Sequence, residues 1–159
     1  MKIAGQNPGA PENEIIVIPR KDINIIFIAQ PVLDYEEFET LCPEPHAPQK
    51  RVPGGSFIRD VTDPGYKKDV EARASRQSIW MMFKSLEPTE NLTWDVLDPT
   101  NPETLTQKNF EKEFRDAGFL PFELNRIVAG IMAANGLDES RVEEARTSFL
   151  ATQQADNEQ

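Results

Sequence analysis

The apolar positions divide the chain into a strand-like first part and a helical second part. Two short runs rich in β-branched residues occupy residues 15–18 and 23–28, and Pro19 to Asp22 separate them. Such runs on either side of a short turn predict a β-hairpin. Neither run alternates apolar with polar residues, which predicts burial on both faces. The helices that follow can cover one face, so the other face needs more chain or a partner.

Proline shapes the rest of the first part. Nine of the 13 prolines lie at or before Pro64, which favours loops, turns and strands over helices there. We expect one or two helical turns over residues 34–41 and an extended segment over residues 43–48, which contain three prolines. Residues 52–58 predict a second tight turn with short flanking strands.

Helical periodicity begins after Asp63, which can cap a long helix that Pro64 opens. Apolar residues at helical spacing form two stripes, namely Tyr66, Val70 and Ala74, then Ile79, Met82, Phe83 and Leu86. The stretch 79–83 is apolar around most of the helix, which indicates either central burial or contact with a partner. Pro88 marks the end of this helix.

Three further helices are expected. One runs from Pro102 to Ala117 with Gly118 as its C-terminal cap, one runs from Pro121 to Asn135, and the last is capped by Asp138. Before them, Leu92, Trp94 and Val96 alternate with polar residues and predict a short strand or extended segment.

The predicted fold class is α+β, with N-terminal β-hairpin(s) and Pro-rich loops packed on a C-terminal bundle of about four helices. We divide the chain into a flexible arm (1–13), a β-hairpin and Pro-rich region (14–62), a helical region (63–152) and a frayed tail (153–159).

Composition narrows the class of partner. The chain has 17 basic and 27 acidic residues and a net charge of −10, which argues against nucleic acid or an anionic membrane as the main partner. No apolar run is long enough for a transmembrane helix, and no signal-peptide stretch opens the chain. With one cysteine no internal disulfide is possible, so we expect a reducing cytoplasm.

Candidate catalytic groups are few. His46 is the single histidine and Cys42 the single cysteine. Nucleophilic dyads and triads generally need a histidine base, and His46 lies in a rigid Pro-rich segment with poor local geometry for pairing with Cys42. Zinc sites need three or four such ligands. We therefore expect no catalytic residue, no metal and no cofactor.

The helical half resembles the tail assembly chaperones encoded among the tail genes of siphophages. The resemblance covers roughly residues 60–152. It rests on the stretches Met82 to Pro88, Leu92 to Trp94, Phe114 to Phe119, Leu124 to Ile127, Ala134 to Leu137 and Glu143 to Leu150. It implies a protein of the host cell cytoplasm that binds the tape measure protein and recruits tail tube subunits. Some members also exist in a longer, frameshifted form.

The leading hypothesis is a non-catalytic chaperone that keeps the tape measure protein soluble, because exposed apolar stripes on a long helical protein aggregate unless they are covered. The predicted partner-binding residues are Trp80, Met81, Phe83, Phe119 and Phe122. Plain core packing is the competing interpretation of all five. Self-association is compatible with the pattern.

Two other functions stay open. One is a structural virion component, such as a tail or head completion protein, whose hairpin edge adds to another subunit's sheet. The other is a small enzyme or an inhibitor that mimics nucleic acid by its charge. Acidic and basic residues alternate along the helices, as in Glu111-Lys112-Glu113, whereas a mimic would present an uninterrupted acidic face.

Overall fold

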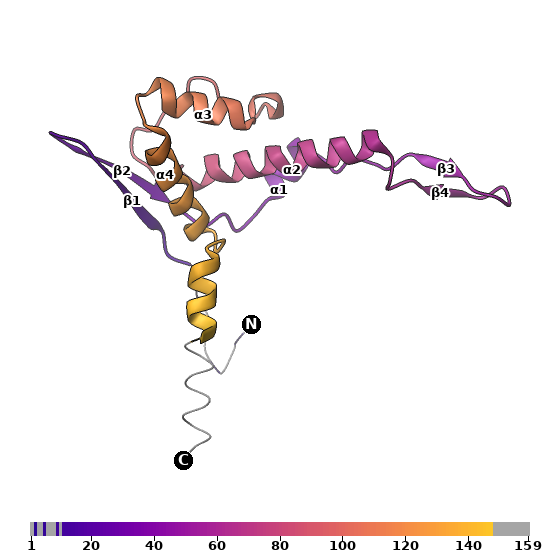
Figure 1. The fold of residues 1–159 in the computed structure, drawn as a ribbon, viewed down its shortest axis with the longest axis horizontal. Helices are drawn as coiled ribbons and strands as arrows, with labels where there is room; N and C mark the ends of the chain where they lie inside the picture. The colour runs from indigo at the N-terminus through magenta and orange to yellow at the C-terminus, as the bar shows by residue number, and fades with distance from the viewer. Residues whose placement is uncertain (1, 3–4, 6–8, 10, 148–159) are drawn as a thin grey trace, which may run out of the picture.

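An antiparallel hairpin and the helices packed on it form the body of the protein in the computed structural model, which describes residues 2, 5, 9 and 11–147 (Figure 1). The chain has the predicted α+β class. Its elements are, in order, β1 (Glu14–Pro19), β2 (Asn24–Ala29), α1 (Glu36–Leu41), β3 (Gln49–Arg51), β4 (Phe57–Arg59), α2 (Pro64–Ser85), the 3₁₀ turn η1 (Pro102–Thr104), α3 (Gln107–Asp116) and α4 (Pro121–Ala134). Residues 139–147 are also helical.

The β1–β2 hairpin buries one face against α4. In its register Ile16 lies opposite Phe27 and Ile18 opposite Ile25. Ile16, Ile18 and Phe27 are buried, and α4 packs across them at Gly130. Because Gly130 has no side chain, the helix can approach Ile16 closely. The hairpin predicted from the two β-branched runs is confirmed. The predicted burial on both faces is wrong for the described residues, because α4 covers one face and the other is exposed at Ile15 and Ile26.

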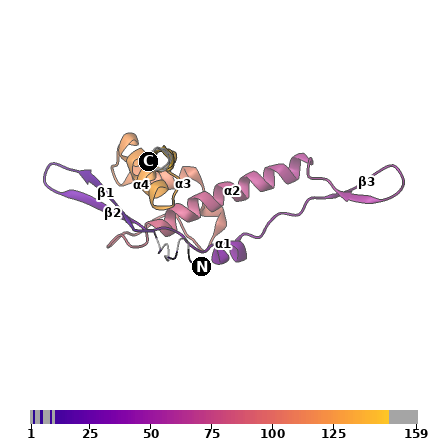
Figure 2. The same cartoon turned by 90° about the horizontal axis from the view of Figure 1, so that it is seen from below.

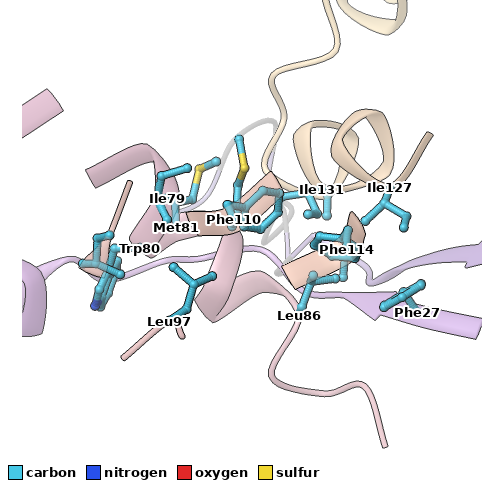
Figure 3. Close-up of a cluster of buried hydrophobic side chains, with 14 of the residues drawn as sticks. Phe27, Ile79, Trp80, Met81, Leu86, Leu97, Phe110, Phe114, Ile127 and Ile131 are labelled. Carbon is cyan, nitrogen blue, oxygen red and sulfur yellow. The ribbon is translucent and has the colours of Figure 1, made fainter. Parts of the chain in front are cut away.

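The core centres on the C-terminal half of α2. Ile79, Trp80, Met81 and Met82 are all buried, in one cluster with aromatic residues of α3 and isoleucines of α4 (Figure 3). Within it, the Trp80 ring packs against Phe38 of α1. Central burial therefore explains why this stretch is apolar around its circumference. Two non-local bonds attach the end of β2 to this helix and its following turn, from the Gln30 amide to the Ser85 carbonyl and from the Ile28 amide to Thr89.

The predicted helix caps are confirmed at three positions. The Asp63 carboxylate accepts a hydrogen bond of 2.8 Å from the Tyr66 amide at the start of α2, and Asp138 caps the 139–147 helix through the Ser140 amide. Gly118 follows α3 with a φ of +84°, a conformation that favours glycine.

Two predicted elements are corrected. Pro102 to Ala117 is not one helix, because η1 and α3 are separated by Leu105, which turns fully into the core while Thr106 caps α3. For residues 92–96 the strand alternative is wrong, because they form a loop bound to Glu113 of α3 rather than to a neighbouring strand.

Two hairpins project from opposite sides of the body (Figures 1 and 2). The β3–β4 hairpin lies beyond the N-terminal half of α2, where the predicted stripe of Tyr66, Val70 and Ala74 does not reach the core; Val70 is 40% exposed. There the stripe packs beside the Pro-rich segment around Pro45 instead. The predicted arm 1–13 lies largely outside the described residues, as do residues 148–152 and the tail 153–159.

Candidate protein-binding surface

The first candidate surface is the uncovered face of the β1–β2 sheet, which we call the outer sheet face. It consists of Ile15, Val17, Ile26 and Ile28. Ile15 is 69% exposed and Ile26 is 52% exposed, although both belong to strands whose other face is core. Side chains alternate between the two faces of a strand, so continuous apolar runs place isoleucine and valine on both. This apolar face has no cover among the described residues.

The outer edge of β1 is also open. The Ile28 amide donates to Thr89 Oγ1 at 2.9 Å and the Thr89 hydroxyl donates to the Ile28 carbonyl, so the Ile28 peptide groups point away from β1. By antiparallel alternation, the peptide groups of Ile15 and Val17 point away from β2. No described residue pairs with them. Thr89 therefore closes part of the β2 edge, while the β1 edge can accept another strand.

The second candidate surface is the β3–β4 arm, residues 49–59. It contains Lys50, Arg51 and Arg59 and no acidic residue. Phe57 is 64% exposed and Ile58 is 47% exposed. Besides its own backbone bonds, the hairpin is held at its base by the bond from the Asp60 amide to the Pro48 carbonyl and by an ion pair of 3.4 Å between Lys50 and the Asp60 carboxylate. It is a basic, partly apolar projection on an acidic protein.

The third candidate surface is an aromatic pocket of about 290 Å³ between β2, the 92–95 loop and α3. Phe27, Trp94, Phe114 and Phe119 line it, with Phe114 5.8 Å from Trp94 and 5.5 Å from Phe119 between ring centroids. Its acidic lining residues are Asp95, Glu113 and Asp116. A hydrogen bond from Lys112 holds the pKa of Asp116 below its usual range, so this carboxylate is ionised at neutral pH.

Glu113 shapes this pocket by holding the loop in front of it. Its Oε1 accepts hydrogen bonds from the amides of Val96 and Leu97 at 2.6 and 2.9 Å, and its Oε2 accepts one from the Asp95 amide. These bonds position Trp94 over Phe110 and place Leu97 in the core. One carboxylate thus replaces the strand partner that this loop does not have.

We expect Glu113→Ala to lower the free energy of unfolding by about 1–3 kcal/mol, because three amides lose a charged acceptor. Urea unfolding followed by tryptophan fluorescence measures the change. Glu111→Ala is the matched control, since Glu111 is exposed on the same helix and, among the residues that the structure describes, accepts a side-chain hydrogen bond from Gln107 alone. Equal stability of the two variants would contradict the anchoring role.

The five predicted partner-binding residues have different environments. Trp80 and Met81 are 2% and 6% exposed, so a partner cannot reach them on this fold. Phe83 is half-buried with its ring 5.4 Å from Trp94. Phe119 is half-buried under Arg20, which also pairs with the buried Glu123. Phe122 is 62% exposed, and the structure does not bring it together with the other four into one surface.

The outer sheet face and the arm were not selected as binding residues from the sequence. For the outer sheet face, the signal in the sequence was the lack of alternation in both strands. It indicated a second apolar face that needs more chain or a partner to cover it. The signal for the second was local charge: residues 49–59 are basic within a chain of net charge −10. Phe57 and Ile58 sit inside that basic segment and are the only large apolar side chains of β4.

The two side chains considered as catalytic candidates lie in different environments. Cys42 is buried, with its carbonyl accepting a hydrogen bond from Arg73, and His46 is exposed on the Pro-rich segment. Within residues 11–147 no group of three or more His, Cys, Asp or Glu is arranged to hold a metal ion. None of the described helices has the length and apolar character needed to cross a membrane. No family model, curated protein or solved structure matches this chain.

Proposed function

We propose that this protein is a non-catalytic phage tail assembly chaperone, acting in the host cytoplasm. It binds the tape measure protein and keeps it soluble while tail tube subunits assemble. The observation that carries the proposal is the outer sheet face, where Ile15 and Ile26 are more than half exposed on a sheet whose other face is core. The resemblance of residues 60–152 supplies the identity of the partner.

The outer sheet face suits an amphipathic helix. Its four β-branched side chains form an apolar strip whose partner must itself be apolar on one side. Burying each such side chain contributes roughly 1.5–3 kcal/mol, so one face binds weakly. Many copies along one long tape measure would hold it by avidity, and each copy remains releasable when the tube closes.

The acidic charge supports the same role. A net charge of −10 keeps a complex with an apolar partner soluble and speeds association with basic segments. It also disfavours contact between copies at random orientations. In this proposal the charged surface keeps the complex soluble, and the outer sheet face binds the apolar partner.

Co-expression with the tape measure protein of the same gene cluster tests the proposal. We expect soluble tape measure that co-elutes with this chain on size exclusion. Ile15→Glu with Ile26→Glu should return it to the insoluble fraction, because two carboxylates would then lie on the apolar strip. Val70→Glu is the control, since Val70 is also an exposed β-branched residue, at 40%, but lies on α2.

A tape measure protein that stays insoluble with the wild-type chain would contradict the proposal. So would full rescue by the Ile15→Glu, Ile26→Glu variant while its own fold, measured by circular dichroism, is intact. Loss of rescue in the Val70→Glu control as well would show that charge alone, rather than this face, is responsible, and would also count against it.

The second candidate is a structural virion component, a tail or head completion protein. The open β1 edge favours it, because the unpaired peptide groups of Ile15 and Val17 can extend a neighbouring subunit's sheet. Mass spectrometry of purified particles separates the two functions. A fixed copy number in mature particles favours the structural role, whereas a chaperone is present during assembly and missing from particles.

A further inference from the structure

We propose that the β3–β4 arm of one molecule docks in the aromatic pocket of a second copy of this chain. The inference concerns self-association and does not rest on tape measure binding, since neither the arm nor the pocket includes a residue of the outer sheet face.

The arm presents an aromatic anchor between two guanidinium groups. Arg51 lies directly opposite Phe57 in the hairpin register, and Arg59 is two residues further along β4, so all three belong to one face. Neither arginine has an ion-pair partner among the described residues. Phe57 is 64% exposed at the end of a projection that touches little of the body. Aromatic and arginine side chains of this kind are the usual anchors of protein interfaces.

The pocket offers the complementary chemistry. Its half-buried rings, Trp94 and Phe119, can make edge and face contacts with an incoming phenyl ring, while the buried Phe114 packs against both of them. Asp95 is exposed, without an ion-pair partner in the described chain, and Asp116 keeps more than half of its side chain exposed beside Lys112. A guanidinium can bind either carboxylate with paired hydrogen bonds. At about 290 Å³, the pocket suits one large side chain rather than a helix.

Charge points to a second copy as the occupant. Residues 49–59 contribute three positive charges and no negative charge, so the rest of the chain carries −13. Two molecules therefore repel each other except where the arm of one meets the body of the other. Residues 72–86 are equally basic, but Arg76 and Lys84 there are ion-paired within the molecule. The charge of the projecting arm therefore favours contact with this protein's own surface.

The arm cannot fill the pocket of its own molecule. The arm lies beyond the N-terminal end of α2, whose 22 residues span roughly 33 Å (Figures 1 and 2). The pocket is instead lined by residues of α3, β2 and the 92–95 loop. Docking is therefore between molecules and joins two different surfaces. A head-to-tail contact of this kind builds rings or open chains rather than two-fold dimers.

Sedimentation velocity of the full chain over a concentration series tests the proposal. We expect reversible association at low ionic strength that weakens as salt screens the charged rim. Arg51→Glu with Arg59→Glu should raise the dissociation constant by about tenfold or more, and Phe57→Ala should do so by a similar factor. Asp95→Arg with Asp116→Arg should have the same effect from the pocket side.

The decisive measurement mixes the two charge-reversed proteins. Each should be monomeric alone, and the mixture should associate, because the acidic arm then meets the basic pocket. Lys21→Glu with Arg126→Glu is the matched control; both residues are exposed and lie outside the arm and the pocket. It should associate as the wild type does.

Three results would overturn the proposal: a wild-type chain that stays monomeric throughout, association that persists in the Arg51→Glu, Arg59→Glu variant, or a mixture that does not associate. Should the pocket variant fail to fold, comparing the dissociation constants of the arm variants and the control variant still tests the proposal. A monomeric chain whose tape measure rescue is intact would reject self-docking and leave the chaperone function standing.

Discussion

Replacement of Trp80 by alanine is expected to lower the free energy of unfolding by about 3–5 kcal/mol. Trp80 is 2% exposed, its ring lies 5.6 Å from Tyr35 and 5.7 Å from Phe38, and the Lys84 ammonium lies over its face. Truncation therefore leaves a cavity at the contact between α2 and the α1 segment, which cannot collapse without moving both. Urea unfolding monitored by circular dichroism measures the loss.

Two further variants make this result specific. Trp80→Phe should be milder than Trp80→Ala, because it keeps an aromatic ring and removes an indole N–H that has no acceptor among the described residues. Phe122→Ala should change stability by less than about 0.5 kcal/mol, because Phe122 is 62% exposed. If Trp80→Ala kept wild-type stability yet abolished tape measure binding, Trp80 would be a surface residue. That result would contradict its burial between α2 and α1.

Gly130→Ala is expected to lower the free energy of unfolding by about 1–3 kcal/mol. On helix propensity alone the change would stabilise α4 by about 1 kcal/mol, since alanine is the better helix former. A Cβ at position 130 would instead overlap Cγ1 and Cδ1 of Ile16, which is 5% exposed and has no space to retreat. Because the overlap outweighs the gain in helix propensity, the net change in the free energy of unfolding is a loss, and α4 must move away from β1.

The matched control is Asn125→Ala, an exposed position of the same helix where only propensity acts. The double variant Gly130→Ala with Ile16→Ala should lose less stability than the sum of the single changes, because shortening Ile16 removes the overlap. Stabilisation by Gly130→Ala, or strict additivity in the double variant, would show that α4 and β1 are not in close contact.

The same contact bears on function. The outer sheet face is presented by a hairpin whose other side is held by α4, so a displaced helix would leave two marginal strands. A Gly130 variant should therefore lose tape measure rescue along with stability, whereas Ile15→Glu with Ile26→Glu should lose rescue alone. This difference separates damage to the fold from damage to the binding surface.

Much of the local structure followed from short-range patterns. The two hairpins, the cap at Asp63, the glycine after α3 and the position of α4 each depend on residues within a few positions of one another. A carboxylate that caps an amide three residues later needs no information from elsewhere in the chain. The single helix expected over 102–117 was wrong because burial of Leu105, a tertiary event, interrupted the local pattern.

The candidate surfaces depended on tertiary packing. Trp80 and Phe122 look alike in the sequence, as aromatic residues in apolar helical stretches, yet one is core and the other is exposed because α1 covers only the first. The absence of alternation in β1 and β2 placed apolar side chains on both sheet faces and predicted burial of both, whereas the described residues cover only one. The packing of α4 decided which sheet face is covered, and the packing of α2 placed the basic arm away from the acidic body. Neither could be predicted from the sequence, since contacts between distant residues leave no local pattern.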